Sequence, residues 1–242
     1  MVEFINPFVA SKEEHAYVQE VAAFPSVMSQ HTAVICGVSR TPIGKFMGAL
    51  SSMSAVDLGV ATVKELCRRM NIDPSTGIID EVLMGQVLQA GIGQAPARQV
   101  ALGAGLPVST SCVTINMVCG SSLKAVMHAA TSIRMGEHNV VIAGGMESMS
   151  NAPQLLMGQR KGKKMGDSKL IDSMIHDGLW DVYNNMHMGN TGEVVSRECS
   201  IDRSQADAFS VQSHMKAAKA WDEGWFDWET FALLDDRSAR AF

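Results

Sequence analysis

The 242-residue sequence lacks several features that would define its class at once. It has no apolar run long enough to cross a bilayer, which predicts a soluble chain with no membrane partner. It has no excess of positive charge, since 20 Lys and Arg stand against 25 Asp and Glu, and this argues against nucleic acid as the main partner. It has no Cys-x-x-Cys pair, and its cysteines number five, so neither a zinc ribbon nor a disulfide framework is expected.

The first 30 residues lack the marks of a targeting segment. They have no basic start followed by an apolar stretch, as a secretory signal would, and they are acidic where a transit peptide is Arg-rich. We expect residues 1–30 to be an N-terminal extension. With reduced thiols, the default location is cytoplasmic, and mitochondrial is the alternative.

Strand signals alternate with helix signals over residues 31–150. Short β-branched apolar runs predict strands at 32–38, 80–87, 113–118 and 139–143. Apolar residues at helical spacing predict helices at 55–70, from 96 to about 104, and from about 123 to 135. The alternation predicts an α/β fold made of βαβ units, with a mainly parallel sheet covered on both faces.

The composition changes after Ser150. Glycines are frequent and residues 160–164 are basic, which indicates a loop-rich excursion from the sheet over 151–229. The basic run would meet phosphates, a neighbouring subunit or only solvent. One helix is clearly signalled: Asp202 is a good N-cap with Gln205 three residues on, and Gly224 ends it.

Cys119 occupies a position that suits chemistry. It lies where a predicted buried strand passes into a helix, and unpaired N–H groups at a helix N-terminus stabilise both a thiolate and an oxyanion beside it. The alternative is an inert core thiol. Cys36 and Cys67 fall on apolar faces and are expected to pack, and Cys112 is expected to precede its strand.

Histidine 187 stands in a glycine- and amide-rich context that is unlike an apolar stripe. His187 is therefore a candidate to hydrogen-bond a thiolate or a thioester-bearing arm, and Met186 and Met188 are candidates to line an apolar channel beside it. A plain dinucleotide-binding module is disfavoured, because Gly91 and Gly93 have no third glycine at the required spacing.

Several long segments, taken in order, resemble the N-terminal half of a thiolase between about Ala33 and Glu229. The most specific are Arg40-Thr-Pro-Ile-Gly44, Gly85 to Gln99, Asn116-Met-Val-Cys-Gly-Ser121, Ala143 to Ser150 and His187-Met-Gly189. The Ala143–Ser150 block and the His187-Met-Gly189 segment resemble degradative and acetoacetyl-CoA thiolases more than ketoacyl synthases. Within that block, Ser148 is expected to shape the fold.

The resemblance implies a function and a set of site residues. Thiolases transfer acyl groups between coenzyme A and 3-ketoacyl-CoA, or condense two acetyl-CoA, with coenzyme A as substrate and no further cofactor. Cys119 matches the acylated nucleophile and its own N–H one donor to the oxyanion. His187, with the adjacent Met188, matches the contact to the pantetheine arm. Residues 151–229 match the loop domain that covers coenzyme A, and the family forms dimers or tetramers.

Two departures from the family pattern are present. Ser122 replaces a usual glycine, which is expected to crowd the approach of the helix. Residues 230–242 diverge from the family, and the second thiolase domain, with the histidine base and a second reactive cysteine, is absent from the sequence. Without its base, Cys119 is expected to lose several orders of magnitude in rate. A catalytically inactive partner subunit or a truncated gene model is therefore the alternative to an active acyltransferase.

Overall fold

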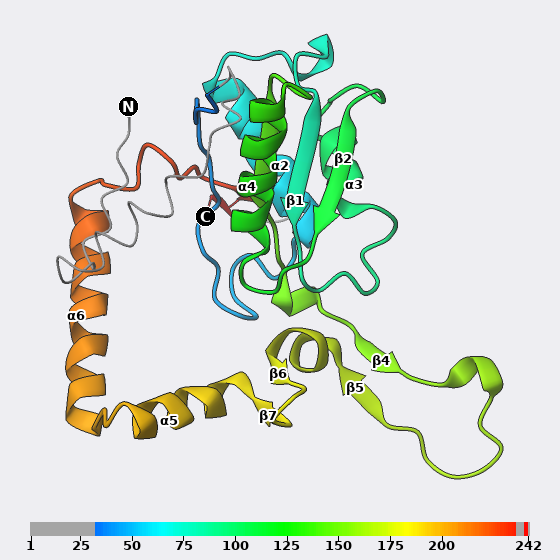
Figure 1. Cartoon of the computed structure of the whole chain (residues 1–242), viewed down its shortest axis with the longest axis vertical. Coiled ribbons are helices and arrows are strands. Elements are labelled where there is room, and N and C mark those ends of the chain that lie inside the picture. The colour runs from blue at the N-terminus through cyan, green and yellow to red at the C-terminus, as the bar shows by residue number, and fades with distance from the viewer. Residues whose placement is uncertain (1–31, 236–239, 242) are drawn as a thin grey trace, which may run out of the picture.

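The computed structural model describes residues 32–235 and 240–241 (Figure 1). The expected N-terminal extension, residues 1–30, and part of the expected tail lie outside the described residues. Three parallel strands form the central sheet in the order β2-β1-β3, namely β1 (Glu81–Gly85), β2 (Ser111–Ile115) and β3 (Val141–Gly145). The predicted α/β class with a parallel sheet is confirmed.

Three helices cover this sheet, and their ends follow local signals. Helix α2 (Ala55–Arg69) begins with a capping box between Ser54 and Asp57. Helix α3 (Pro96–Gly103) begins at a proline, whose fixed φ suits the first turn. Helix α4 (Ser121–Met135) ends at Gly136, which takes the left-handed conformation with φ +75°. The three helices agree with the predicted ranges to within about two residues at each end.

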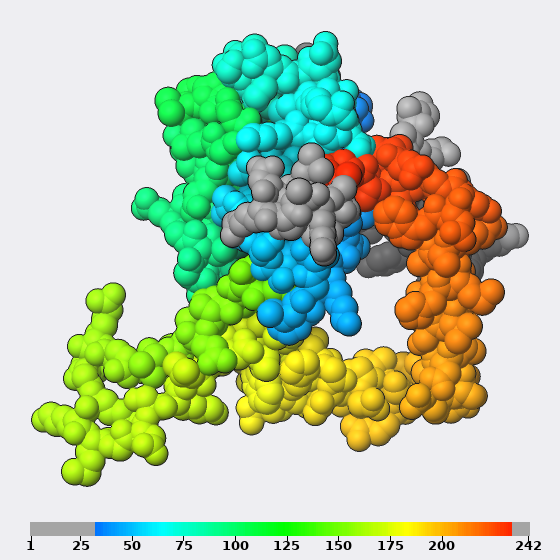
Figure 2. All heavy atoms as spheres, turned by 180° about the vertical axis from the view of Figure 1, so that it is seen from behind, coloured from blue at the N-terminus to red at the C-terminus, as the bar shows by residue number. Residues whose placement is uncertain are grey.

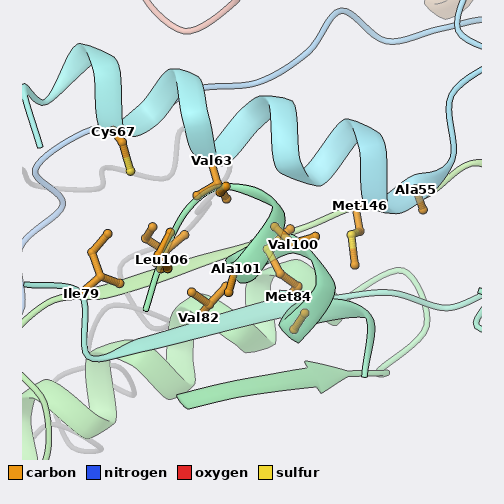
Figure 3. Packing of buried hydrophobic residues seen from close by; sticks show 13 residues of the cluster. Ala55, Val63, Cys67, Ile79, Val82, Met84, Val100, Ala101, Leu106 and Met146 are labelled. Atoms are coloured by element: carbon orange, nitrogen blue, oxygen red, sulfur yellow. The ribbon is translucent and has the colours of Figure 1, made fainter. Parts of the chain in front are cut away.

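The core lies on the face of the sheet that α2 and α3 cover. Side chains alternate along a strand, so Val82 and Met84 of β1 enter the cluster formed with α2 and α3 (Figure 3). Leu83 points to the other face and packs with Ala125 and Ala129 of α4. Both faces of β1 are therefore buried, as expected for the central strand of a parallel sheet.

The strand predicted at residues 32–38 is wrong. This segment is not a strand, and Val34 and Ile35 are 69% and 70% exposed. A strand needs a neighbour to take up its backbone hydrogen bonds. Among the described residues, the nearest β-pairing to this segment is the isolated bridge between Arg40 and Thr230. The expectation that Cys36 packs in the core is also wrong, because Cys36 is exposed.

The third predicted strand is displaced by two residues. It begins at Ser111, so Cys112 does not precede the strand but lies inside it, opposite Val82 of β1. A 3-10 turn, η1 (Pro74–Thr76), follows α2, and η2 (Met149–Asn151) follows β3.

Residues 154–229, which we call the arm, extend away from the sheet (Figures 1 and 2). They contain the hairpin β4 (Gln154–Leu156) and β5 (Leu170–Asp172) with η3 (Gln159–Lys161) between them, the π-helix η4 (Met174–Leu179), the short pair β6 (Trp180–Asp181) and β7 (Met186–His187), and helices α5 (Met188–Glu198) and α6 (Arg203–Asp222). A last pair, β8 (Leu234–Asp235) and β9 (Arg240–Ala241), follows the arm.

The arm contains little buried surface. Ser173 and Ala220 are its buried residues, and α6 is exposed at every other position. Figure 2 shows open space between α6 and the body of the molecule. The far end of the arm returns to the core, where Arg40 Nε is 2.8 Å from Glu229 Oε1 and Arg69 donates hydrogen bonds to the carbonyls of Trp228 and Thr230.

Candidate active site

The carboxyl ends of β1 and β3 finish in glycines that admit helix α4. A Cβ built on Gly85 would lie 2.6 Å from the carbonyl carbon of Ser121, and one built on Gly145 would overlap the hydroxyl of Ser122. The first turn of α4 therefore sits directly on the end of the sheet. The expected crowding by Ser122 does not arise, because its side chain occupies the space that Gly145 leaves empty.

A tight turn joins β2 to α4 and carries Cys119. Val118 has φ +48°, a left-handed conformation that is an outlier for a β-branched residue. The buried side chain of Ser121 closes this turn, since its hydroxyl accepts the N–H of Met117 at 2.9 Å and donates to the carbonyl of Val118 at 2.5 Å. Strained turns held in this way are common at functional sites.

Cys119 is exposed and directly precedes Gly120, the N-cap of α4. The N–H groups of Gly120 and Ser121 bond to the carbonyls of Met117 and Val118. Within residues 32–235, the N–H of Cys119 makes no hydrogen bond. The turn thus presents a thiol next to the positive end of a 15-residue helix, which suits an addition that generates an oxyanion.

The other four cysteines have different surroundings. Burial raises the pKa of the Cys67 thiol, and burial is also the largest cause of the raised pKa of Cys112. Cys36 and Cys199 are exposed, and neither stands before a helix N-terminus. Exposure and a helix N-terminus are therefore combined at Cys119 alone among the five thiols.

Glu147 also lies at this edge of the sheet, and its contacts there were not predicted from the sequence. Its Oε2 accepts the N–H of Val87 at 2.9 Å and its Oε1 that of Leu88 at 3.1 Å. Burial raises the pKa of Glu147, and the two backbone hydrogen bonds partly oppose that rise. The signal available in the sequence was an acidic residue two positions after the end of a buried strand.

Ser148, in the same segment, donates its hydroxyl to the carbonyl of Met53 at 2.9 Å. This contact joins the loop after β3 to the N-terminus of α2. It is consistent with the expected role in shaping the fold.

His187 and Met188 lie in the arm. The Nδ1 of His187 accepts the N–H of Gly189 at 3.0 Å and thereby caps α5, while Met188 is the exposed first residue of that helix. No hydrogen bond joins His187 to Cys119 in the part of the chain that the structure describes. The arm does approach the same edge of the sheet, because a Cβ built on Gly178 of η4 would lie 3.2 Å from the side chain of Leu88.

Other features of the surface do not belong to this site. A cavity of about 340 Å³ lies between Ser54 and Asp57 at the start of α2 and the loop at Gly91, and Cys119 does not line it. Within residues 32–235 and 240–241, no three His, Cys, Asp or Glu side chains come together in a way that would hold a metal ion. In the same residues, no helix is both long and apolar enough to span a bilayer.

These observations describe an α/β protein whose parallel sheet carries, at its carboxyl edge, an exposed thiol on a strained strand-to-helix turn. Residues 33–234 match the model of the thiolase N-terminal domain, and the chain therefore belongs to the thiolase family.

Two acetyl-CoA acetyltransferases illustrate the match. The chain is 50% identical to acetyl-CoA acetyltransferase 2 of Arabidopsis thaliana over 195 residues, which are 81% of this chain and 48% of that protein. It is also 50% identical to the acetyl-CoA acetyltransferase of Cupriavidus necator over 201 residues, 83% of this chain and 51% of that protein. The chain spans about half the length of the curated relatives it matches.

Proposed function

We propose that the chain accepts an acyl group from a coenzyme A thioester on Cys119, as the nucleophile-bearing part of a thiolase-type acetyltransferase. The observation that carries the proposal is the exposed thiol of Cys119, on a strained turn directly before the N-terminus of α4. The similarity to acetyl-CoA acetyltransferases supports coenzyme A thioesters as the substrate class.

The proposed reaction has two halves. The Cys119 thiolate adds to the C3 carbonyl of a 3-ketoacyl-CoA, and the C2–C3 bond breaks, leaving the acyl group on sulfur. The departing C2 takes up a proton and leaves as acetyl-CoA. The thiol of free coenzyme A then loses its proton, attacks the acyl-cysteine and releases acyl-CoA and the Cys119 thiolate. The N–H of Cys119 is the proposed donor to the oxyanion in both additions.

His187 and Met188 are proposed to contact the pantetheine arm of coenzyme A. The support is that the arm of the protein packs at Leu88, beside the edge of the sheet that carries Cys119. The imidazole offers its Nε2 to a ligand, because its Nδ1 is engaged with Gly189. Self-association is proposed at β2, which is one of the two edge strands of the three-stranded sheet and exposes 43% of Val113. A monomer in sedimentation velocity contradicts this last proposal.

Acylation of Cys119 tests the proposed function. The chain is incubated with acetyl-CoA, and acetylated peptides are quantified by mass spectrometry. We expect acetyl transfer to Cys119 with release of coenzyme A, and no transfer in Cys119→Ser at that position. Cys199 is the matched control because it is also exposed but lies at the C-cap of α5. Equal labelling of Cys199 and Cys119, or none at Cys119, refutes the proposal.

A second candidate is a subunit that carries Cys119 but turns over slowly by itself. It is favoured by the lack of a hydrogen bond from any histidine to Cys119 among the described residues. Thiolysis of acetoacetyl-CoA separates the two candidates. An efficient catalyst cleaves it in many turnovers, whereas a nucleophile without a base is acylated and then turns over several orders of magnitude more slowly. We expect the slow outcome for this chain.

A further inference from the structure

The turn at Cys119 needs support beyond the Ser121 hydroxyl. Ser121 binds the N–H of Met117 and the carbonyl of Val118, but not the N–H of Val118. Val118 itself is held in a left-handed conformation that its β-branched side chain disfavours. A relaxed Val118 would change the orientation of Cys119 at the start of α4, because Val118 is the residue directly before the thiol.

Asn116 supplies the missing contact on the outer side of the turn. Its Oδ1 accepts the N–H of Val118 at 2.9 Å, and its Nδ2 donates to the carbonyl of Val87 at 3.4 Å. The two ends of the amide have opposite requirements, so only one orientation of the side chain satisfies both partners. Asn116 therefore connects the strained residue to the segment after β1.

Glu147 fixes that segment from the other side. Its carboxylate accepts the N–H groups of Val87 and Leu88, so Val87 is bound at its N–H by Glu147 and at its carbonyl by Asn116. Gln86 adds a backbone bond from its N–H to the carbonyl of Ile115 at 2.9 Å. The ends of β1, β2 and β3 are thus joined by one set of hydrogen bonds that finishes at Val118.

We infer that Asn116 and Glu147 are positioning residues for Cys119. Asn116 holds Val118 in the strained conformation that keeps the thiol at the N-terminus of α4, and Glu147 holds the Val87 segment on which Asn116 rests. The inference rests on the proposed function only in giving Cys119 a reaction to perform, because the geometry concerns the reactivity of the thiol itself.

The test measures alkylation by iodoacetamide at each cysteine by mass spectrometry, in the full chain. Exposed Cys199 is the reference thiol, and buried Cys67 reports any general opening of the core. We expect Asn116→Ala to lower the ratio of Cys119 to Cys199 labelling about fivefold, the scale of losing a helix N-terminus. Glu147→Gln is expected to lower it about twofold, because one carboxylate oxygen that accepts a hydrogen bond becomes an NH₂ group.

A suppressor separates positioning from general stability. Glycine adopts positive φ without strain, so Val118→Gly added to Asn116→Ala is expected to restore the labelling ratio. An unchanged ratio in Asn116→Ala overturns the inference, and so does a lowered ratio that Val118→Gly fails to restore. Labelling of Cys67 in Asn116→Ala assigns the effect to unfolding and overturns it as well.

The two proposals fail in different ways. Alkylation needs no coenzyme A, so the labelling pattern can hold in a chain that never accepts an acetyl group from acetyl-CoA. That result refutes the proposed function and leaves the positioning of Cys119 intact. The reverse result, acetyl transfer to Cys119 with no dependence on Asn116, refutes only the positioning.

Discussion

Helices α2 and α6 begin with the same device and lie in different surroundings. Each starts with a capping box, Ser54 with Asp57 in α2 and Asp202 with Gln205 in α6. Helix α2 buries four residues against α3 and the sheet, whereas α6 buries only Ala220. Caps thus decide where a helix begins, while its stability in a protein comes mostly from packing an apolar face. The body of the molecule is packed, and the arm is held mainly at its ends.

The largest expected difference between the two regions is in the free energy of unfolding that is lost when a methionine side chain is truncated to alanine. Met84 of β1 is 3% exposed, and Met84→Ala is expected to lower the free energy of unfolding by about 2–5 kcal/mol. Met215 of α6 is 67% exposed, and Met215→Ala is expected to change it by less than about 0.5 kcal/mol. Urea unfolding followed by circular dichroism measures both. Similar losses for the two variants would show that α6 is packed in solution.

The two capping boxes give a smaller effect. Ser54→Ala is expected to lower the free energy of unfolding by about 1 kcal/mol, because α2 unfolds with the core. Asp202→Ala removes an equivalent cap, yet it is expected to reduce only the local hydrogen-exchange protection of α6. Urea unfolding measures the global loss of stability in each variant, and hydrogen exchange measures the local loss of protection in α6. A global loss in Asp202→Ala equal to that in Ser54→Ala contradicts the separation of the regions.

The smallest expected effect lies at the junction of the two regions. Hydrogen bonds from Arg68 and Arg69 lower the pKa of Glu65 from 4.5 to about 2, and Arg69 also binds the carbonyls of Trp228 and Thr230. A carboxyl whose pKa is lowered in the folded state stabilises it above the unfolded pKa. This stabilisation falls as pH drops from about 4.5 towards 2.

We therefore expect wild type to exceed Glu65→Gln in stability by about 0.5 kcal/mol at neutral pH, the scale of partly exposed ion pairs. The difference should shrink on acidification to about pH 3. Urea unfolding of both proteins at the two pH values measures it. A difference that stays constant on acidification would mean that Glu65 acts through packing and not through its charge.

The sequence predicted those elements whose signals are local. The periodicity at 55–70 and the N-cap at Asp202 located α2 and α6, and the strand-to-helix step located the turn at Cys119. Residues 32–38 have a strand-like composition, but a strand depends on a neighbour that composition does not reveal. Helix α5 was missed because Gly189 and Gly192 weaken its signal.

The sequence singled out Cys119 as a candidate, whereas it did not predict the residues that support its turn. Position before a helix and family resemblance both singled out Cys119. Asn116 and Glu147 both bind backbone atoms of Val87. Every residue type has these backbone atoms, so the identity of residue 87 gives no sign of either hydrogen bond. The left-handed Val118 was equally hidden, since valine is among the residues least expected there.

The attachment of the arm at both ends has a consequence for encounters within the molecule. Ser173 donates its hydroxyl to the carbonyl of Pro153 at 2.6 Å near the start of the arm, and Arg40 and Arg69 bind Glu229 and Trp228 at its far end. A chain segment held at both ends explores a smaller volume than a free end, so the two attachments limit how far His187 can move from the body of the molecule. Loss of the Arg40 and Arg69 contacts would release the far end of this loop, and the conformational freedom of the arm would rise.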